Sequence, residues 1–198
     1  MDRLSSWDEK AGLQSIIPSV LTFGMIGYPF VLPDMIGGNA YSDLETFGGG
    51  AYPDRELYIR WLQVNTLLPA MQFSVVPWIY DSEVLTITQK FIALREKYVD
   101  VIVKLAEESV ESGNPIVRPL WWIAPEDEHA LTSGDEFLLG NDLLVAPVTV
   151  EGARKRDIYL PAGSWKDLLR NEIVDGPILL KEYAVALDQL PHFERQKN

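Results

Sequence analysis

The stretch Gly27-Tyr28-Pro29-Phe30-Val31-Leu32-Pro33-Asp34-Met35-Ile36-Gly37-Gly38-Asn39 decides how the rest of the chain is interpreted. It is an apolar run that ends at one carboxylate, Asp34, followed by two glycines. A short run with almost no charge is typical of a strand buried on both faces, as in parallel sheets covered by helices. Chemistry in such sheets gathers at the carboxyl ends of the strands, so Asp34 is a candidate site residue. A lone Asp before glycines also commonly caps a turn, and that alternative stays open here.

The composition predicts a folded globular chain and excludes several kinds of site. With 198 residues, 47% of them hydrophobic, the chain can bury a large core. It has 29 acidic against 17 basic residues and no basic cluster, so nucleic acid is not an expected partner. Cysteine is absent, and the two histidines, His129 and His192, stand apart. We therefore expect no disulfide, no metal site and no cofactor.

A membrane span is the alternative that the stretch Leu13 to Pro33 raises. It holds 21 residues without a charge, about the length that crosses a bilayer. Its prolines and glycines favour instead a helix from about Leu13 to Phe23, a turn, and a strand from about Tyr28 to Leu32. No signal peptide is visible, because Met1 is followed by a polar tract. A membrane-associated structural protein thus remains an alternative that rests on this stretch alone.

Helices alternate with strand-like runs over the first part of the chain. Helical patterns run from Asp54 to about Val64 and from Asp81 or Ser82 to Gly113. The strand-like runs are Tyr28–Leu32, Met71–Pro77 and Ile116–Ile123. Alternation of this kind predicts part of a parallel α/β unit. The loop from Ala40 to Pro53, rich in Gly and aromatic residues, is long enough to suggest a functional role.

After Glu126 the pattern changes to short strands separated by turn residues. The runs are Phe137–Gly140, Leu143–Val148, Arg156–Pro161, Trp165 and Ile178–Leu180. Such spacing predicts a small antiparallel β-sandwich. We therefore place a domain boundary near residue 125, giving domains at 1–125 and 126–198. The second domain is too small for an independent core, so we expect it to pack against the first.

Six segments of the chain, in order, resemble the motifs of glycoside hydrolase family 31. They are Asp2 to Trp7 (family pattern Gly-Asp-Asn-x-Ser-x-Trp), Gly27 to Gly38 (Gly-x-Pro-x-x-Gly-x-Asp-Ile-Gly-Gly-Phe), Glu56 to Gln63 (Glu-Leu-x-x-Arg-Trp-x-Gln), Ile116 to Leu120 (Arg-Pro-Leu), Asp135 to Val148, and Asp157 to Trp165. The resemblance implies an α/β fold class. Residues 1–125 would be the C-terminal part of a (β/α)8 TIM barrel, followed by the antiparallel β-sandwich at 126–198.

The resemblance also implies roles for three residues. Asp2 would be the general acid and base of a retaining α-glycosidase that hydrolyses O-glycosyl bonds. Asp8 also lies near Trp7 and is the rival candidate, but the spacing from Asp2 to Trp7 fits the family tract better. Asp34 would accept hydrogen bonds from sugar hydroxyls, because bonds to a charged acceptor are the stronger kind. Ser74 stands where family members have a sugar-contacting histidine, so it is a candidate substrate-binding residue.

The chain departs from the family pattern in ways that bear on the substrate. The serine at position 74 puts the usual glucose recognition in doubt and makes an α-galactoside as plausible a substrate as an α-glucoside. The Asp-Ile-Gly-Gly-Phe phrase carries one extra residue here and ends in Asn39. In the family the nucleophilic Asp lies on an earlier barrel strand, upstream of residue 1. We therefore expect this chain to be a C-terminal fragment that carries only the acid/base and is inactive alone.

Other interpretations and locations stay open. A non-catalytic carbohydrate-binding or scaffold protein is favoured by aromatic residues that could be exposed, namely Tyr41, Phe47, Tyr52, Trp78 and Trp165. The expected partner is a carbohydrate, and any membrane association would come from a part upstream of residue 1. The compartment is undetermined. Similarity to an α-galactosidase-like member of the family, if it holds, implies the endoplasmic reticulum or the secretory pathway.

Overall fold

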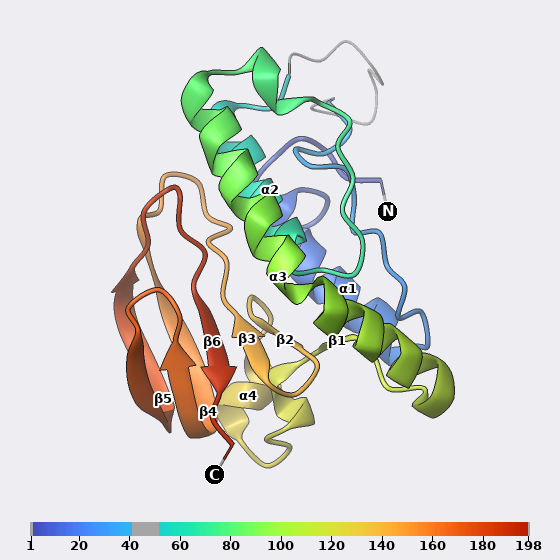
Figure 1. The fold of residues 1–198 in the computed structure, drawn as a ribbon, viewed down its shortest axis with the longest axis vertical. Coiled ribbons are helices and arrows are strands. Elements are labelled where there is room, and N and C mark those ends of the chain that lie inside the picture. Colours follow the sequence, from blue (N-terminus) through green and yellow to red (C-terminus); the bar gives the residue numbers. More distant parts are fainter. Residues whose placement is uncertain (1, 41–51, 198) are drawn as a thin grey trace.

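The computed structural model describes residues 2–40 and 52–197, with helices on one side and an antiparallel sheet on the other (Figure 1). The helices are α1 (Ile16–Met25), α2 (Arg55–Thr66), α3 (Ser82–Ser112) and α4 (Glu128–Thr132). The strands are β1 (Val117–Arg118), β2 (Phe137–Leu139), β3 (Leu143–Val145), β4 (Lys155–Asp167), β5 (Glu172–Ala184) and β6 (His192–Arg195). The larger part of the loop expected at Ala40–Pro53, with Tyr41 and Phe47, lies outside the described residues.

The helices expected in the first part of the chain are confirmed, and local caps explain their ends. The Asp54 carboxylate accepts a hydrogen bond from Leu57 N (2.9 Å) at the start of α2. The Asp81 carboxylate does the same for Val84 N (2.8 Å) at the start of α3. That helix ends at Gly113, whose φ of 77° suits a residue without a side chain. Pro18 lies in the first turn of α1, so it does not kink the helix.

The strands expected in the first part are largely wrong. Tyr28–Leu32 forms no strand, and Tyr28 and Phe30 are exposed rather than buried. Over residues 2–40 and 52–197, the parallel pairing is a single bridge between Met35 and Gln72. Prolines at 29 and 33 remove two backbone donors from this run, which limits the ladder it can form.

The run Ile116–Ile123 also differs from the expected parallel strand. Its only strand residues are Val117 and Arg118, which pair antiparallel with β2. A 3-10 helix follows at Leu120–Trp122. This segment therefore belongs to the antiparallel sheet and not to a parallel layer.

The antiparallel β-structure expected after Glu126 is present as one continuous sheet of order β1-β2-β3-β6-β4-β5. The expected strands are all found, and β4 and β5 are longer than the sequence indicated. The pairing of β4 with β5 changes register at two places in β4, between Arg156 and Ile158 and between Leu160 and Gly163. Such bulges bend a strand and increase its twist, which curls the sheet. The helix α4 and the strand β6 were not predicted.

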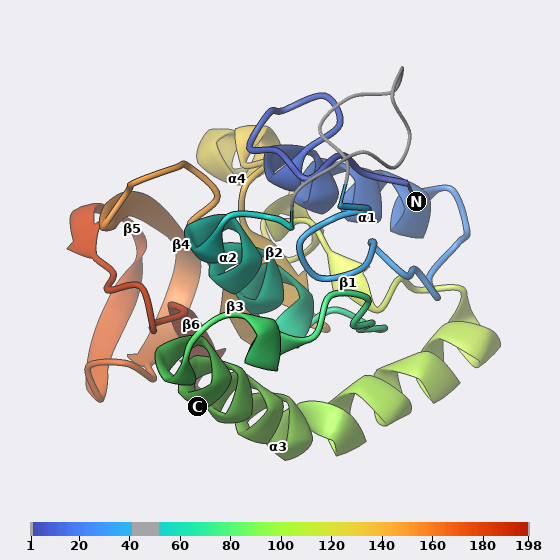
Figure 2. The ribbon, with the colours of Figure 1, turned by 90° about the horizontal axis from the view of Figure 1, so that it is seen from above.

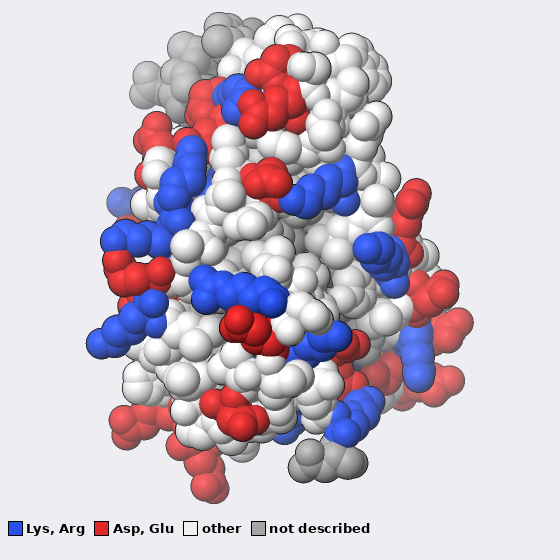
Figure 3. All heavy atoms as spheres, turned by 60° about the vertical axis from the view of Figure 1, so that its left-hand side comes forward, with Lys and Arg blue, Asp and Glu red and all other residues white. Residues whose placement is uncertain are grey.

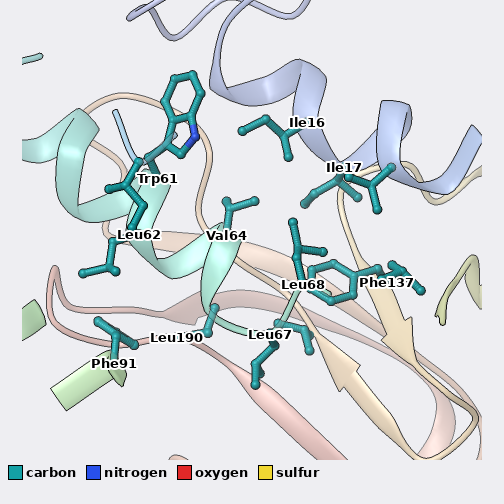
Figure 4. Close-up of a cluster of buried hydrophobic side chains, with 14 of the residues drawn as sticks. Ile16, Ile17, Trp61, Leu62, Val64, Leu67, Leu68, Phe91, Phe137 and Leu190 are labelled. Atoms are coloured by element: carbon teal, nitrogen blue, oxygen red, sulfur yellow. The ribbon is translucent and has the colours of Figure 1, made fainter. Parts of the chain in front are cut away.

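Strands β2 and β3 lie between two hydrophobic clusters, and alternate side chains enter each. Phe137 and Leu143 pack with the helices in the first cluster, whereas Leu138 and Leu144 join β4 in the second. Figure 4 shows Phe137 and Leu190 close to side chains of α1 and α2. The core is therefore continuous from the helices into the sheet, as expected for a domain too small to fold by itself.

Two motif residues of α2 donate buried hydrogen bonds to loops that connect the strands of the antiparallel sheet. The part of the chain that carries most of this sheet, residues 126–198, is called the β-domain below. The Arg60 guanidinium, fully buried, donates to the carbonyls of Ala153 (3.1 Å) and Ala186 (3.3 Å). Gln63 Nε2 donates to Leu187 O (2.6 Å). In Figure 2, α2 lies between α1 and α3 with the sheet beside it. These bonds explain why the Glu-Leu-x-x-Arg-Trp-x-Gln pattern needs its polar residues inside a buried helix.

The surface carries charges of both signs side by side. Figure 3 shows Lys and Arg interspersed with Asp and Glu over one face. Ion pairs of the chain include Arg154 with Glu56 (2.5 Å) and Lys90 with Asp188 (2.8 Å). Within the described ranges, no helix combines the length and the apolar character that a bilayer crossing needs. The helix in the stretch from Leu13 to Pro33 has only ten residues.

Candidate active site

The tract after Asp2 lies directly against the turn that follows Asp34. Asn39 N donates to Arg3 O (3.0 Å), and Ala40 N donates to Ser5 Oγ (2.8 Å). Between these bonds, Gly38 has a φ of 79° and comes so close to Leu4 that a Cβ would lie 3.0 Å from the Leu4 carbonyl. Glycine is needed here for both reasons. The fold thus brings two motifs that are more than thirty residues apart into contact.

Asp34 is buried, with 4% of its surface exposed, and main-chain donors surround its carboxylate. Arg3 N donates to Oδ2, and Met35 N donates to Oδ1 (2.6 Å). Asn39 Nδ2 lies 3.4 Å from Oδ2. Burial raises the pKa of Asp34, the main-chain hydrogen bonds oppose the rise, and the charge of Asp2 adds to it.

Asp2 and Asp8, the two candidates for the acid/base, have different surroundings. Asp2 is exposed and precedes Arg3 directly. Asp8 closes a local turn, with Oδ1 accepting from Lys10 N (2.9 Å) and Ala11 N (2.8 Å). The Ser6 hydroxyl and these amides lower the pKa of Asp8, which makes it a poor proton donor at neutral pH. The Asp8 carboxylate is thus engaged in its own turn, whereas Asp2 is exposed.

Ser74 lies at the same edge of the fold as Asp34. Ile36 N donates to Gln72 O (2.9 Å), and Met35 pairs in parallel with Gln72, so the two segments run side by side. Ser74 is two residues beyond this bridge and is exposed.

Sequence reasoning missed two residues that contact Asp34. Asn65, fully buried on α2, donates from Nδ2 to the main-chain oxygen of Asp34 (2.8 Å). Asn39 was noted only as a departure from the family phenylalanine. A signal existed for Asn65, because an amide at a buried helical position requires a hydrogen-bond partner.

The aromatic residues considered for carbohydrate binding lie partly on the surface and partly in the core. Tyr52 and Trp78 are 66% and 69% exposed, whereas Trp165 is fully buried and donates to Pro161 O (2.8 Å). Trp165 therefore belongs to the core and cannot bind a carbohydrate.

Among the described residues, no group of three His, Asp or Glu side chains is placed to hold a metal ion.

The site has one exposed carboxylate and one buried carboxylate at the same edge. An exposed carboxyl can exchange protons with a ligand and with water. A buried carboxylate held by main-chain N–H groups is fixed in position and still has acceptor capacity for a hydroxyl donor.

Comparison with known proteins agrees with this architecture. Residues 2–105 match the profile described as the "Glycosyl hydrolases family 31 TIM-barrel domain", and residues 113–198 match the "Glycosyl hydrolase family 31 C-terminal domain". The fold superposes on a GH31 sulfoquinovosidase from E. rectale, solved with an aza-sugar inhibitor, at a TM-score of 0.86 and 26% identity. That alignment covers 100% of this chain and 29% of the other.

Two curated relatives align with nearly the whole chain. The myogenesis-regulating glycosidase of Mus musculus is 52% identical over 98% of this chain and 27% of its own length. The SITS-binding protein of Tetronarce californica is 42% identical over 99% of this chain and 28% of its own. The chain thus spans about a quarter of the length of these relatives. With both halves matched in order, the chain belongs to glycosyl hydrolase family 31, as a C-terminal portion of the TIM barrel joined to the family's C-terminal domain.

Proposed function

We propose that the chain is the C-terminal part of a retaining α-glycosidase, with Asp2 as acid/base and Asp34 in the sugar subsite. The observation that carries the proposal is the contact between the tract after Asp2 and the Asp34 carboxylate, through Arg3 N. It brings a proton-exchanging group and a fixed acceptor to one edge of the barrel portion. The named glycosidase relative and the inhibitor-bound sulfoquinovosidase support the same reaction class.

In the proposed mechanism Asp2 manages the proton in both steps. Protonated, it gives its proton to the glycosidic oxygen as the bond to the anomeric carbon breaks, and the alcohol leaves. A second carboxylate attacks the anomeric carbon and forms a glycosyl ester. Asp2, now ionised, takes a proton from water, which attacks the same carbon and releases the second carboxylate. The two carboxyl groups of a retaining pair stand roughly 5 Å apart. The nucleophile would come from barrel strands that this chain does not include.

The residues around Asp34 bear on the choice of sugar. Ser74 offers a hydroxyl where family members have a histidine, and Asn39 offers an amide where they have a phenylalanine. A hydroxyl and an amide can both donate and accept hydrogen bonds, whereas phenylalanine can only pack. We propose that this more polar edge accommodates an α-galactoside, with its axial hydroxyl, or an α-glucoside.

The acid/base role is tested in the longer protein that contains this sequence. Asp2→Ala should reduce kcat/KM most for substrates with poor leaving groups, because only these need a strong proton donor. Aryl α-galactosides and α-glucosides of graded leaving-group pKa provide the series, and Asp8→Ala is the matched control. Equal losses for good and poor leaving groups, or a larger effect of Asp8→Ala, would move the acid role elsewhere.

A second test uses the 198 residues alone. Because the chain would supply only one of the two carboxylates, it should not hydrolyse either series of aryl glycosides. Turnover that disappears in Asp34→Ala would contradict the proposed division of the catalytic pair.

A non-catalytic binding protein is the second candidate function. It is favoured by the relative from Tetronarce californica, whose name describes binding and not hydrolysis. Exposed Tyr52 and Trp78 could stack on a ligand. Calorimetry of the longer protein with galactose and glucose distinguishes the two, since binding without any turnover selects this candidate.

A further inference from the structure

We propose that Asn65 is a positioning residue for Asp2, acting through Asp34. This inference rests on the acid/base role proposed above. It concerns a buried residue of α2, whereas neither carboxylate lies on a helix. The basis is a continuous series of hydrogen bonds from α2 to the residue that follows Asp2.

The first link joins Asn65 to the main chain of Asp34. Nδ2 of Asn65 donates to Asp34 O at 2.8 Å, and both residues are buried. Within the described residues Oδ1 of Asn65 has no partner, so this amide acts there only as a donor. Because this bond goes to the main chain, the Asp34 carboxylate can still accept hydrogen bonds from other groups.

The second link joins the Asp34 carboxylate to the Asp2 tract. Arg3 N donates to Oδ2 of Asp34, and Asn39 N donates back to Arg3 O (3.0 Å). Arg3 is therefore held on both its main-chain groups by the segment that Asn65 fixes. Only one peptide unit separates Arg3 from Asp2, so a shift of Asp34 moves Asp2 with it.

The third link makes α2 a rigid support for Asn65. Earlier on the same helix, Arg60 and Gln63 donate to carbonyls of the β-domain at Ala153, Ala186 and Leu187. The helix is thus fixed on the side away from Asp34. Helix α2 therefore links the β-domain to Asp34 and, through Arg3, to Asp2.

Amide hydrogen exchange of Arg3, measured by NMR on the 198-residue chain, tests the links directly. Asn65→Leu removes the donor while keeping the number and branching of the side-chain heavy atoms, and Thr66→Val is the matched control. Thr66 is equally buried on the next position of α2, but its hydroxyl bonds only to Leu62 O (2.7 Å). We expect exchange at Arg3 to be about tenfold faster in Asn65→Leu than in Thr66→Val, because a held main-chain group is released. Asn65→Ser, which keeps a short donor, should fall between them.

Equal exchange rates at Arg3 in the leucine and valine variants would overturn the proposal. In the longer protein, Asn65→Leu should also shift the limb of the kcat/KM pH profile that Asp2 governs, whereas Thr66→Val should leave that limb in place. An unmoved limb in an active Asn65→Leu enzyme would likewise overturn it. If the wild-type protein hydrolyses no glycoside, the proposed function fails, while the exchange experiment still decides whether Asn65 holds Arg3.

Discussion

Gly38 lies against the main chain of Leu4, so close that a Cβ at position 38 would lie 3.0 Å from the Leu4 carbonyl, a tighter contact than side chains usually make. We predict that Gly38→Ala destabilises the chain by about 2 to 4 kcal/mol, from strain at positive φ together with this tight contact. It should also separate the Asp2 tract from Asp34. Urea unfolding measures the first effect, and the NMR shift of the Arg3 amide reports the second.

Gly27→Ala is the control for this prediction. Gly27 also has a positive φ, of 93°, but nothing lies within 4 Å of a Cβ built on it. It should therefore cost only the backbone strain, about 1 kcal/mol, and leave the Arg3 amide shift unchanged. Similar losses at both glycines would show that the close approach to Leu4 is unimportant.

Arg60 should contribute far more to stability than an exposed arginine of the same helix. Arg60→Met removes buried hydrogen bonds from a charged donor to the carbonyls of Ala153 and Ala186, which should cost about 3 kcal/mol even though Arg154 Nη1 and Gln189 N still donate to these two oxygens. Arg55→Met is the matched control. Arg55 is partly exposed and pairs with the exposed Asp81 (2.7 Å), so its loss should cost less than about 1 kcal/mol.

Urea unfolding followed by tryptophan fluorescence compares the two arginine variants. The structural reason can be checked as well, since hydrogen exchange in the β-domain should accelerate in Arg60→Met and not in Arg55→Met. Equal costs for the two variants would mean that α2 is not fastened to the β-domain through Arg60.

The sequence predicts α2 and α3 well because their signals are local. Asp54 and Asp81 cap the helices with their own side chains, and Gly113 ends α3 in a left-handed conformation. These features act within a few residues of chain. Strands β2 and β3 were predictable for a similar reason, since a short continuous apolar run indicates burial on both faces.

The strand expected at Tyr28–Leu32 fails because a strand depends on its neighbours. In the described residues this region pairs only through Met35 and Gln72, and Pro29 and Pro33 donate no hydrogen bonds. The candidate site shows the same limit. The motifs indicated Asp2 and Asp34, but Asn65 is recruited by the packing of α2, and no local pattern shows which main-chain group a buried amide will bind.

The pKa of Asp34 should respond to the charge at position 2. Burial raises this pKa, and the negative charge of Asp2 adds to the rise. Asp2→Asn removes that charge, so the pKa of Asp34 should fall in the variant. A carbon-13 NMR titration of the Asp34 carboxyl measures the change. Asp8→Asn is the control, because the Asp8 carboxylate is engaged in its own turn with Lys10 N and Ala11 N and has no hydrogen bond to the described residues around Asp34. A pKa unchanged by Asp2→Asn would place the two carboxylates too far apart to cooperate.

Glu136 should make the stability of the chain depend on pH. Burial raises the pKa of this carboxyl from 4.5 to about 7, against the opposing effects of Arg156 and of Tyr159 N, which donates to Oε1 (3.0 Å). The neighbouring charge of Asp135 adds to the rise. Because the folded state binds this proton more tightly than the unfolded state, the stabilisation is complete below the unfolded pKa. It is lost as pH rises through the folded pKa.

Glu136→Gln isolates this effect, since glutamine keeps an acceptor for Tyr159 N and does not titrate. The free energy of unfolding of the wild type relative to the variant should fall by about 2 kcal/mol between pH 5 and pH 8, most of it before pH 7. Urea unfolding at intervals of half a pH unit measures the difference, and titrations elsewhere in the chain cancel in the comparison. A relative stability that stays level, or that rises with pH, would mean that Glu136 is ionised in the folded chain throughout this range. The Arg156 guanidinium, 3.1 Å from Oε1, would then outweigh the cost of burial.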